Sequence, residues 1–261
     1  MAGTRAPSPL SWQRATMPPE MACVPLVLVP GLMCDAAVWA PLQSALAACA
    51  RCQIADHGDA DSITVMAQQV LDGAPAEFAL AGHSMGARVA LEVVRLAPAR
   101  VLRLALLDTG YKARPGGSVG ENEARQRLAL LEQARREGVR AMALQWVQGM
   151  LHPQHLHDGT LVPAIIAMFG RKSADVFARQ ITALLARPDA APVLAAVRVP
   201  TLVLCGRQDS WAPVAQHEEM HALLACRTRL HVVEQAGHMS PMEQPGAVAQ
   251  AMLAWLRTPA G

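Results

Sequence analysis

Ser84 lies in a setting that turns an ordinary serine into a nucleophile. It is the centre of the pentapeptide 82–86, Gly-His-Ser-Met-Gly, which follows an apolar run at 77–81 and precedes a helical pattern at 87–96. Between a strand and a helix, this G-x-S-x-G pattern places the serine on a sharp turn, because the glycines allow a tight backbone and leave the hydroxyl uncovered. The sequence therefore predicts Ser84 as the nucleophile of a hydrolase.

A serine hydroxyl needs a base to accept its proton and a carboxylate to orient that base. His238 follows an apolar run at 230–233, and Asp209 follows another at 201–205. Residues that follow parallel strands meet at one edge of a sheet, so both side chains are expected near Ser84. The chain order of serine, acid and histidine is also the order that accompanies this serine motif. We therefore predict His238 as the general base and Asp209 as the acid.

The anionic intermediate of acyl transfer needs backbone N–H donors. One is expected from the residue after the nucleophile, which is Met85, and the other from the loop after an early strand. The run at 25–29 leads into such a loop, where Leu32 is the predicted donor and Met33 the less favoured alternative. Gly31 would allow the backbone to come close to the serine.

These residues must be positioned by a larger framework of strands and helices. Short apolar runs predict buried strands at 25–29, 53–55, 77–81, 103–107, 201–205 and 230–233. Helical patterns separate them at 36–48, 62–71, 87–96, 214–224 and 245–256. This alternation predicts an α/β fold with a mostly parallel sheet flanked by helices.

The alternation is interrupted once, because about 90 residues separate the fourth run from the fifth, far more than a crossover needs. The interruption starts with a stretch rich in glycine and proline at 114–120. Apolar stripes then predict helices at 121–137, 139–150, 160–169 and 174–185. We interpret 111–197 as a helical cap on a core formed by 23–110 and 198–261, with a loose extension at 1–22.

Four segments together resemble the α/β-hydrolase superfamily, in its capped, lipase-like carboxylesterase branch. They are the elbow GHSMG, the loop VPGLM, the segment GRQD and the tail GHMSPMEQP, and the resemblance extends across 24–256. Pro30 is a departure, because many members have histidine there. The resemblance implies an α/β-hydrolase fold with an inserted cap and a serine esterase that needs no cofactor and no metal. Some members place the acid where Asp108 lies, so Asp108 is an alternative to Asp209.

Side chains near the predicted catalytic segments and on the apolar faces of the cap are candidates for a substrate pocket. They are Met33, His83, Trp146, Met150, Met168 and Met239. An apolar cap favours small to medium hydrophobic esters as small-molecule substrates. The same catalytic residues would also serve a C–C bond, amide or lactone hydrolase or a perhydrolase. A ligand-binding receptor without catalysis is an alternative of another class, since a fold alone does not determine function.

Three other features suggest chemistry that the sequence context does not favour. The segment 217–221, His-Glu-Glu-Met-His, matches the H-E-x-x-H zinc pattern, but no further ligand is apparent and the helix fits a crossover. His152, His155, His157 and Asp158 crowd one loop, which we interpret as a solvated connection between cap helices. Cys49 and Cys52 follow a helical pattern and precede a strand, the reverse of a thioredoxin-like context.

Composition narrows the remaining classes. Hydrophobic residues make up 52% of the 261 residues, charged residues 17%, and the net charge is +2. A charge this small, without a basic run, gives no surface for nucleic acid. No apolar stretch approaches the roughly 20 residues that span a bilayer, so no membrane insertion is expected. Six cysteines without a secretory signal indicate free thiols in a cytoplasmic protein.

Overall fold

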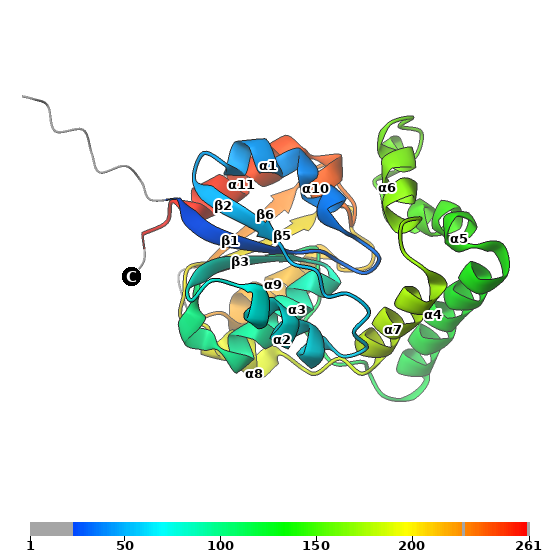
Figure 1. The fold of residues 1–261 in the computed structure, drawn as a ribbon, viewed down its shortest axis with the longest axis horizontal. Coiled ribbons are helices and arrows are strands. Elements are labelled where there is room, and N and C mark those ends of the chain that lie inside the picture. The colour runs from blue at the N-terminus through cyan, green and yellow to red at the C-terminus, as the bar shows by residue number, and fades with distance from the viewer. Residues whose placement is uncertain (1–22, 226–227, 260–261) are drawn as a thin grey trace, which may run out of the picture.

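Six parallel strands form the single sheet of the described chain. The computed structural model describes residues 23–225 and 228–259, so the predicted loose extension at 1–22 lies outside the described residues. The order across the sheet is β2-β1-β3-β4-β5-β6, and every neighbouring pair is parallel (Figure 1). The strands are β1 Val24–Val29, β2 Ala50–Ile54, β3 Phe78–His83, β4 Val101–Leu107, β5 Thr201–Gly206 and β6 Thr228–Val233. The predicted α/β class with a parallel sheet is confirmed.

Burial explains where the predicted strand limits were wrong. All residues of the inner strands β3 and β5 are buried, and these strands lie close to the predicted apolar runs. The edge strands β2 and β6 alternate between inward and outward residues, so polar side chains such as Arg51 and Arg229 interrupt the apolar pattern. Each edge strand therefore begins two or more residues before the run that predicted it.

Helices cover both faces of the sheet (Figure 1). Helices α1 Ala40–Leu46 and α11 Pro245–Leu256 pack together on one face. Helices α2 Ile63–Gly73, α3 Met85–Leu96, α8 Ala191–Ala196 and α9 Val214–Leu223 cover the other. The helix predicted at 36–48 is divided into a 3-10 turn, Ala36–Val38, and α1, because Pro41 favours a new helix start.

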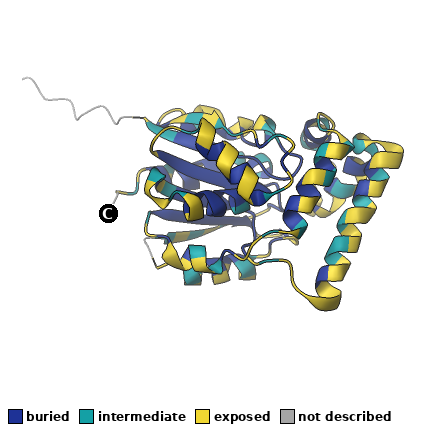
Figure 2. Ribbon diagram, turned by 60° about the horizontal axis from the view of Figure 1, so that its bottom comes forward, coloured by how far each residue is buried: buried dark blue, intermediate teal, exposed yellow. Residues whose placement is uncertain are grey.

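Four helices between β4 and β5 lie beyond the carboxyl ends of the strands, apart from the two helical layers (Figure 1). We call them the inserted helices: α4 Gly117–Glu137, α5 Val139–Trp146, α6 Leu161–Phe169 and α7 Ala174–Leu185. Their outer faces are exposed, whereas the sheet is buried (Figure 2). Helix α4 starts within the glycine-rich stretch, and 3-10 turns at Val147–Gly149 and Pro153–His155 lie between α5 and α6.

The direction in which successive strands are added to the sheet reverses between β1 and β3. The chain leaves β1 toward one edge of the sheet, forms β2, and returns to the other side of β1 as β3. Open α/β sheets bind ligands at such a reversal, outside the carboxyl ends of the strands. The loops that carry Leu32 and Ser84 follow these two strands and therefore meet there. No helix in 23–225 or 228–259 is long and apolar enough to cross a membrane.

Two glycines allow α3 to pack against neighbouring backbone. A Cβ added at Gly86 would collide with the carbonyl oxygens of Val29 and Pro30, at the end of β1. A Cβ at Gly82 would collide with the backbone of Gly86 and Ala87. Backbone atoms cannot rotate away as a flexible side chain can, so neither position has room for a larger residue.

We expect Gly86→Ala to lower the free energy of unfolding by at least about 2 kcal/mol, through overpacking against fixed carbonyl groups. Gly246→Ala is the matched control, because Gly246 is also the second residue of a helix and has open space around it. Alanine is the better helix former, so the control should be neutral or slightly stabilised. Urea unfolding followed by circular dichroism measures both, and equal stabilities would contradict the packing argument.

Candidate active site

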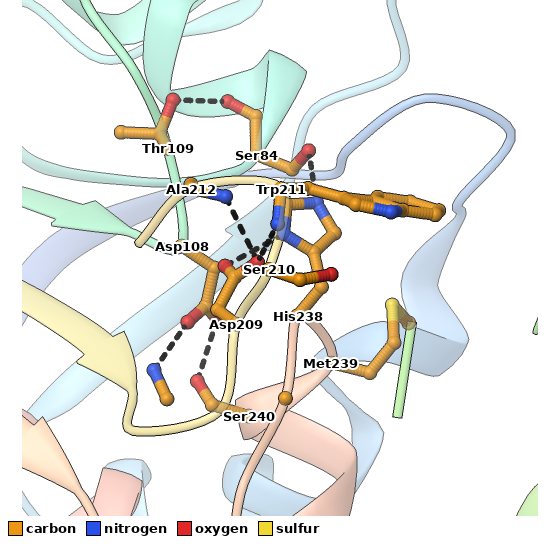
Figure 3. Close-up of polar contacts among 12 residues, drawn as sticks. Ser84, Asp108, Thr109, Asp209, Ser210, Trp211, Ala212, His238, Met239 and Ser240 are labelled. Atoms are coloured by element: carbon orange, nitrogen blue, oxygen red, sulfur yellow. Dashed lines mark hydrogen bonds and ion pairs between the residues drawn. The ribbon is translucent and has the colours of Figure 1, made fainter. Parts of the chain in front are cut away.

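Ser84 occupies the turn between β3 and α3 in a strained conformation. Its φ of 54° and ψ of −117° belong to a region that residues with side chains rarely adopt. The turn is held by Ser84 N, which donates to the Leu107 carbonyl at 2.8 Å, and by Thr109 Oγ1, which donates to the Ser84 carbonyl at 2.8 Å. The side chain is thereby directed away from the sheet, toward His238 (Figure 3).

A continuous chain of hydrogen bonds joins the three predicted catalytic side chains (Figure 3). Ser84 Oγ lies 2.8 Å from His238 Nε2, and His238 Nδ1 lies 2.8 Å from Asp209 Oδ2. With the proton on Nδ1, the ring donates to Asp209 and accepts from Ser84. This is the geometry in which an imidazole takes the proton of a serine hydroxyl.

Asp209 is held as an anion by its surroundings. Its second oxygen, Oδ1, accepts hydrogen bonds from the amides of Trp211 and Ala212, both at 2.9 Å. Burial raises the pKa of this carboxyl, but the charge and hydrogen bond of His238, together with the two amides, outweigh burial and lower the pKa below its usual value. The carboxylate therefore faces His238 in its charged form.

His238 is buried, and its pKa depends on the carboxylates around it. Burial lowers the pKa of the ring, but the charge and hydrogen bond of Asp209, with further contributions from Asp108 and Glu243, outweigh burial and raise the pKa above the usual value. The Trp211 ring lies against the imidazole, with centroids 5.0 Å apart, and stacks on Trp146 at 5.6 Å. These contacts link the histidine to the inserted helices.

Asp108, the alternative acid, does not contact His238 (Figure 3). Its Oδ1 accepts from the Gly206 amide at 2.9 Å, and its Oδ2 accepts from Ser240 Oγ at 2.6 Å. Burial, followed by the charge of Asp209, raises the pKa of Asp108 well above its usual value. Asp108 therefore ties the loop after β5 to the segment after His238, and Asp209 is the carboxylate that orients the ring.

Glu243 holds the loop around His238 from the other side. Its Oε1 accepts from the amides of Gly237 and Met239 at 2.9 and 3.1 Å. Its Oε2 accepts from the His152 amide at 2.7 Å and lies 3.0 Å from His155 Nδ1. The histidine-rich segment after α5 is thus anchored to the loop that carries His238. The predicted solvated connection therefore holds for His157 and Asp158, which are exposed, but not for His152 and His155, which are partly buried against Glu243.

The two predicted oxyanion donors lie beside Ser84. Met85 begins α3, and both Leu32 and Met85 line the cavity in front of the serine. A Cβ added at Gly31 would lie 3.1 Å from Ser84 Cβ, a tight contact that shows how closely this loop approaches the serine. The alternative donor, the Met33 amide, is engaged elsewhere, because it donates to Gln180 Oε1 at 2.9 Å.

A cavity of about 710 Å³ opens at Ser84, between the sheet and the inserted helices. Of the predicted pocket residues, His83, Trp146, Met150 and Met239 line it. Met33 and Met168 do not, and this part of the pocket prediction is wrong. Both side chains are fully buried in the core, because the sequence pattern marks an apolar face without showing which side of it meets a ligand.

Several side chains of the site were assigned no role there from the sequence. Thr109 and Glu243 bind backbone groups, while Trp211 and Arg88 line the cavity; each becomes recognisable only when distant segments meet. His217, from the H-E-x-x-H segment, belongs to this group. Its Nε2 accepts from the Thr109 amide at 3.0 Å, and its Nδ1 lies 3.2 Å from the Pro213 carbonyl, so both ring nitrogens are used to hold the loop after β4.

His83 and the cysteines have no polar role that points to catalysis. His83 Nε2 donates to the His238 carbonyl at 2.9 Å, and burial, followed by the charge of His238, lowers the pKa of His83 to about 3. His83 is therefore neutral and supports the loop of His238. Cys23, Cys34, Cys49, Cys52 and Cys205 are free thiols, and Cys226 lies outside the described residues.

Comparison with known proteins identifies the family of this chain. A model described as the alpha/beta hydrolase family matches residues 26–251. This chain belongs to the α/β-hydrolase family. It is 31% identical over 251 residues to the dihydrolipoyllysine-residue acetyltransferase component of the acetoin cleaving system of Pseudomonas putida, covering 89% of this chain and 63% of that relative. The match thus covers less than two thirds of that protein's length.

Two further proteins are similar to this chain. A 2-succinyl-6-hydroxy-2,4-cyclohexadiene-1-carboxylate synthase of Serratia proteamaculans is 27% identical over 182 residues, covering 69% of this chain and 68% of that protein. A thermophilic esterase from Thermogutta terrifontis has a similar structure, with a TM-score of 0.78 and 27% identity, covering 90% of this chain and 89% of the esterase.

The two carboxylates should respond differently to amide replacement. Asp209→Asn presents an amide to His238 Nδ1 and disturbs the tautomer, so the rate at which a fluorophosphonate phosphonylates Ser84, with release of fluoride, should fall by about 10³- to 10⁴-fold. Asp108→Asn keeps an acceptor for Gly206 and a partner for Ser240, and the rate should fall less than about tenfold. Active-site labelling with time measures both rates. A larger loss in Asp108→Asn would assign the acid role to Asp108.

The raised pKa of His238 sets the pH dependence of the same reaction. Only the neutral ring accepts a proton. The rate at which the fluorophosphonate labels Ser84 should therefore decline as the pH falls through the pKa of His238, which lies above the usual histidine value of about 6.5. Asp209→Asn removes the negative charge that raises this pKa, and the midpoint should move to lower pH. Rates of labelling across pH measure the midpoints. An unchanged midpoint in the variant would show that Asp209 does not set the pKa.

Proposed function

We propose that this α/β-hydrolase cleaves carboxylic esters of small to medium size through an acyl-serine intermediate. The observation that carries the proposal is the hydrogen-bonded series Ser84, His238 and Asp209 at the mouth of a cavity. A binding protein without catalysis has no need for a strained serine aligned on a buried imidazole. The similarity to an esterase at 27% identity supports the same reaction.

The proposed reaction follows from the positions of these groups. His238 Nε2 accepts the proton as Ser84 Oγ attacks the ester carbonyl, and Asp209 stabilises the imidazolium. The amides of Leu32 and Met85 donate to the oxyanion that forms. His238 then protonates the leaving alcohol, and a water molecule activated by the same ring hydrolyses the acyl-serine. The reaction needs no cofactor and no metal.

The inserted helices would act as a cap in this scheme. Trp146 of α5 and Phe169 of α6 line the cavity opposite Ser84, and their rings pack 5.3 Å apart. Apolar rings at this position limit the access of water and contact the hydrophobic part of a substrate. The insertion would therefore set substrate size, while the core carries the catalytic groups.

Cleavage of another bond with the same triad is the second candidate. The observation that favours it is the similarity to a protein named 2-succinyl-6-hydroxy-2,4-cyclohexadiene-1-carboxylate synthase. A neutral imidazole next to a serine and an oxyanion site also suits proton abstraction near a carbonyl group and C–C bond cleavage. Acylation of Ser84 is required for ester hydrolysis, so trapping an acyl-serine separates the candidates.

The first experiment compares p-nitrophenyl esters of increasing acyl length with wild type, Ser84→Ala and Ser44→Ala. Ser44 is exposed on α1 and serves as the matched control. We expect turnover by wild type with a preferred chain length, set by the cavity, and a loss of at least about 10³-fold in kcat for Ser84→Ala. Ser44→Ala should match wild type.

Each result has a distinct meaning for this proposal. Activity that survives in Ser84→Ala would reject the serine mechanism. Absence of turnover in wild type, with Ser84 still labelled by a fluorophosphonate, would favour the second candidate. Absence of labelling as well would favour a receptor that binds a ligand without catalysis.

A further inference from the structure

One wall of the cavity contains charged side chains that ester cleavage does not require. Arg88 of α3, Glu123 and Arg127 of α4, and Arg187, which follows α7, all line it. Arg187 donates to both oxygens of Glu123, at 2.7 and 2.8 Å, and Arg127 donates at 2.9 Å. Burial raises the pKa of Glu123, but these two arginines outweigh burial and lower it to about 2. One carboxylate is therefore shared by two cations.

Arg88 is the third cation of this wall, and no carboxylate forms an ion pair with it in the described part of the chain. Its Nη1 donates to the Lys112 carbonyl at 2.9 Å. Burial, followed by the charges of Arg187 and Arg127, lowers the pKa of the half-buried guanidinium to about 9, so it stays charged at neutral pH. A guanidinium has five N–H donors, and most of these remain for a ligand.

Arg88 follows Ser84 by one helical turn, and both residues line the same cavity. Ser84 directly precedes α3 and Arg88 is four residues further, so the two residues share a helix face about 6 Å apart along the axis. Gly110 leaves room beside Arg88, because a Cβ there would lie 2.7 Å from Arg88 Nη2 and 2.6 Å from Gln216 Nε2. A second polar group therefore borders the same space.

We infer that Arg88 binds a free carboxylate of the substrate, so that the preferred esters carry a carboxylate a few bonds from the ester group. The inference rests on the proposed ester hydrolysis and specifies its substrate class. A carboxylate accepts two parallel hydrogen bonds from a guanidinium and would balance the excess positive charge of the wall. Binding at Arg88 would also place the ester carbonyl at Ser84. The sequence had indicated purely hydrophobic esters.

Three esters of matched size test this preference. Monomethyl glutarate and γ-acetoxybutyrate carry a carboxylate on the acyl and the alcohol side, respectively, and methyl pentanoate is neutral. We expect wild type to hydrolyse at least one of the two charged esters with a kcat/KM at least tenfold above that of methyl pentanoate. In Arg88→Gln this selectivity ratio should fall at least tenfold, because the charge-assisted hydrogen bonds are lost.

Arg125→Gln is the matched control, because Arg125 is an exposed residue of α4 that does not line the cavity. It should keep both the rates and the ratio of wild type. A purely structural role of Arg88 would lower both classes of ester together and leave the ratio unchanged, which would overturn the inference. Hydrolysis of methyl pentanoate by wild type without any preference for a charged ester would also overturn it, while the proposed ester hydrolysis would stand.

A binding measurement decides the inference even if none of the esters is hydrolysed. Glutarate is added to Ser84→Ala and to the double variants Ser84→Ala with Arg88→Gln or Arg125→Gln, and thermal unfolding is followed. Saturating glutarate should raise the Tm by about 2 to 4 °C when Arg88 is present and not when it is replaced. Equal shifts in all three proteins, or none, would overturn the inference.

Discussion

Close packing of the turn between β3 and α3 against the end of β1 is the constraint on which the site depends. It leaves no space for a side chain at Gly82 or Gly86 and little at Gly31, and Ser84 within this turn has a positive φ. The strain is balanced by the burial of α3 and by hydrogen bonds from the strands beside it. The position of Ser84 is consequently fixed by its backbone before any substrate binds. Its hydroxyl is already within hydrogen-bond distance of His238 Nε2.

Asp209 and Asp108 both lie near His238, and their pKa values shift in opposite directions because the groups around them differ. Asp209 has the ring and two amides, which favour its charged form. Asp108 is fully buried beside that charge, accepts hydrogen bonds from one hydroxyl and one amide, and lies 3.6 Å from Nε2 of the neutral His83 ring. Two close carboxylates cannot both ionise easily, so one carries the charge that the imidazolium needs and the other supports the loops. Position along the strands alone does not separate these roles.

The elements that carry a strong local pattern could be predicted from the sequence: the inner strands, the turn at Ser84, and the order of Ser84, Asp209 and His238. Edge strands such as β2 were misplaced because only alternate residues are buried. Met33 and Met168 were assigned to the pocket because an apolar face does not reveal whether it meets core or ligand. Arg88 was not recognised, since its meaning depends on Glu123 being already shared by two other arginines, which no spacing along the chain encodes.

Glu243 joins parts of the chain that are usually regarded as separable modules. Its buried carboxylate binds the backbone on both sides of His238 with one oxygen and the segment after α5 with the other. A chimera that exchanges the whole insertion for that of another hydrolase would leave half of this carboxylate without donors, at a cost that falls on the catalytic loop. An exchange confined to α4 and α5 would keep this chain's own 150–155 segment and its contacts with Glu243. The substrate range could then change without disturbing the loop that carries His238.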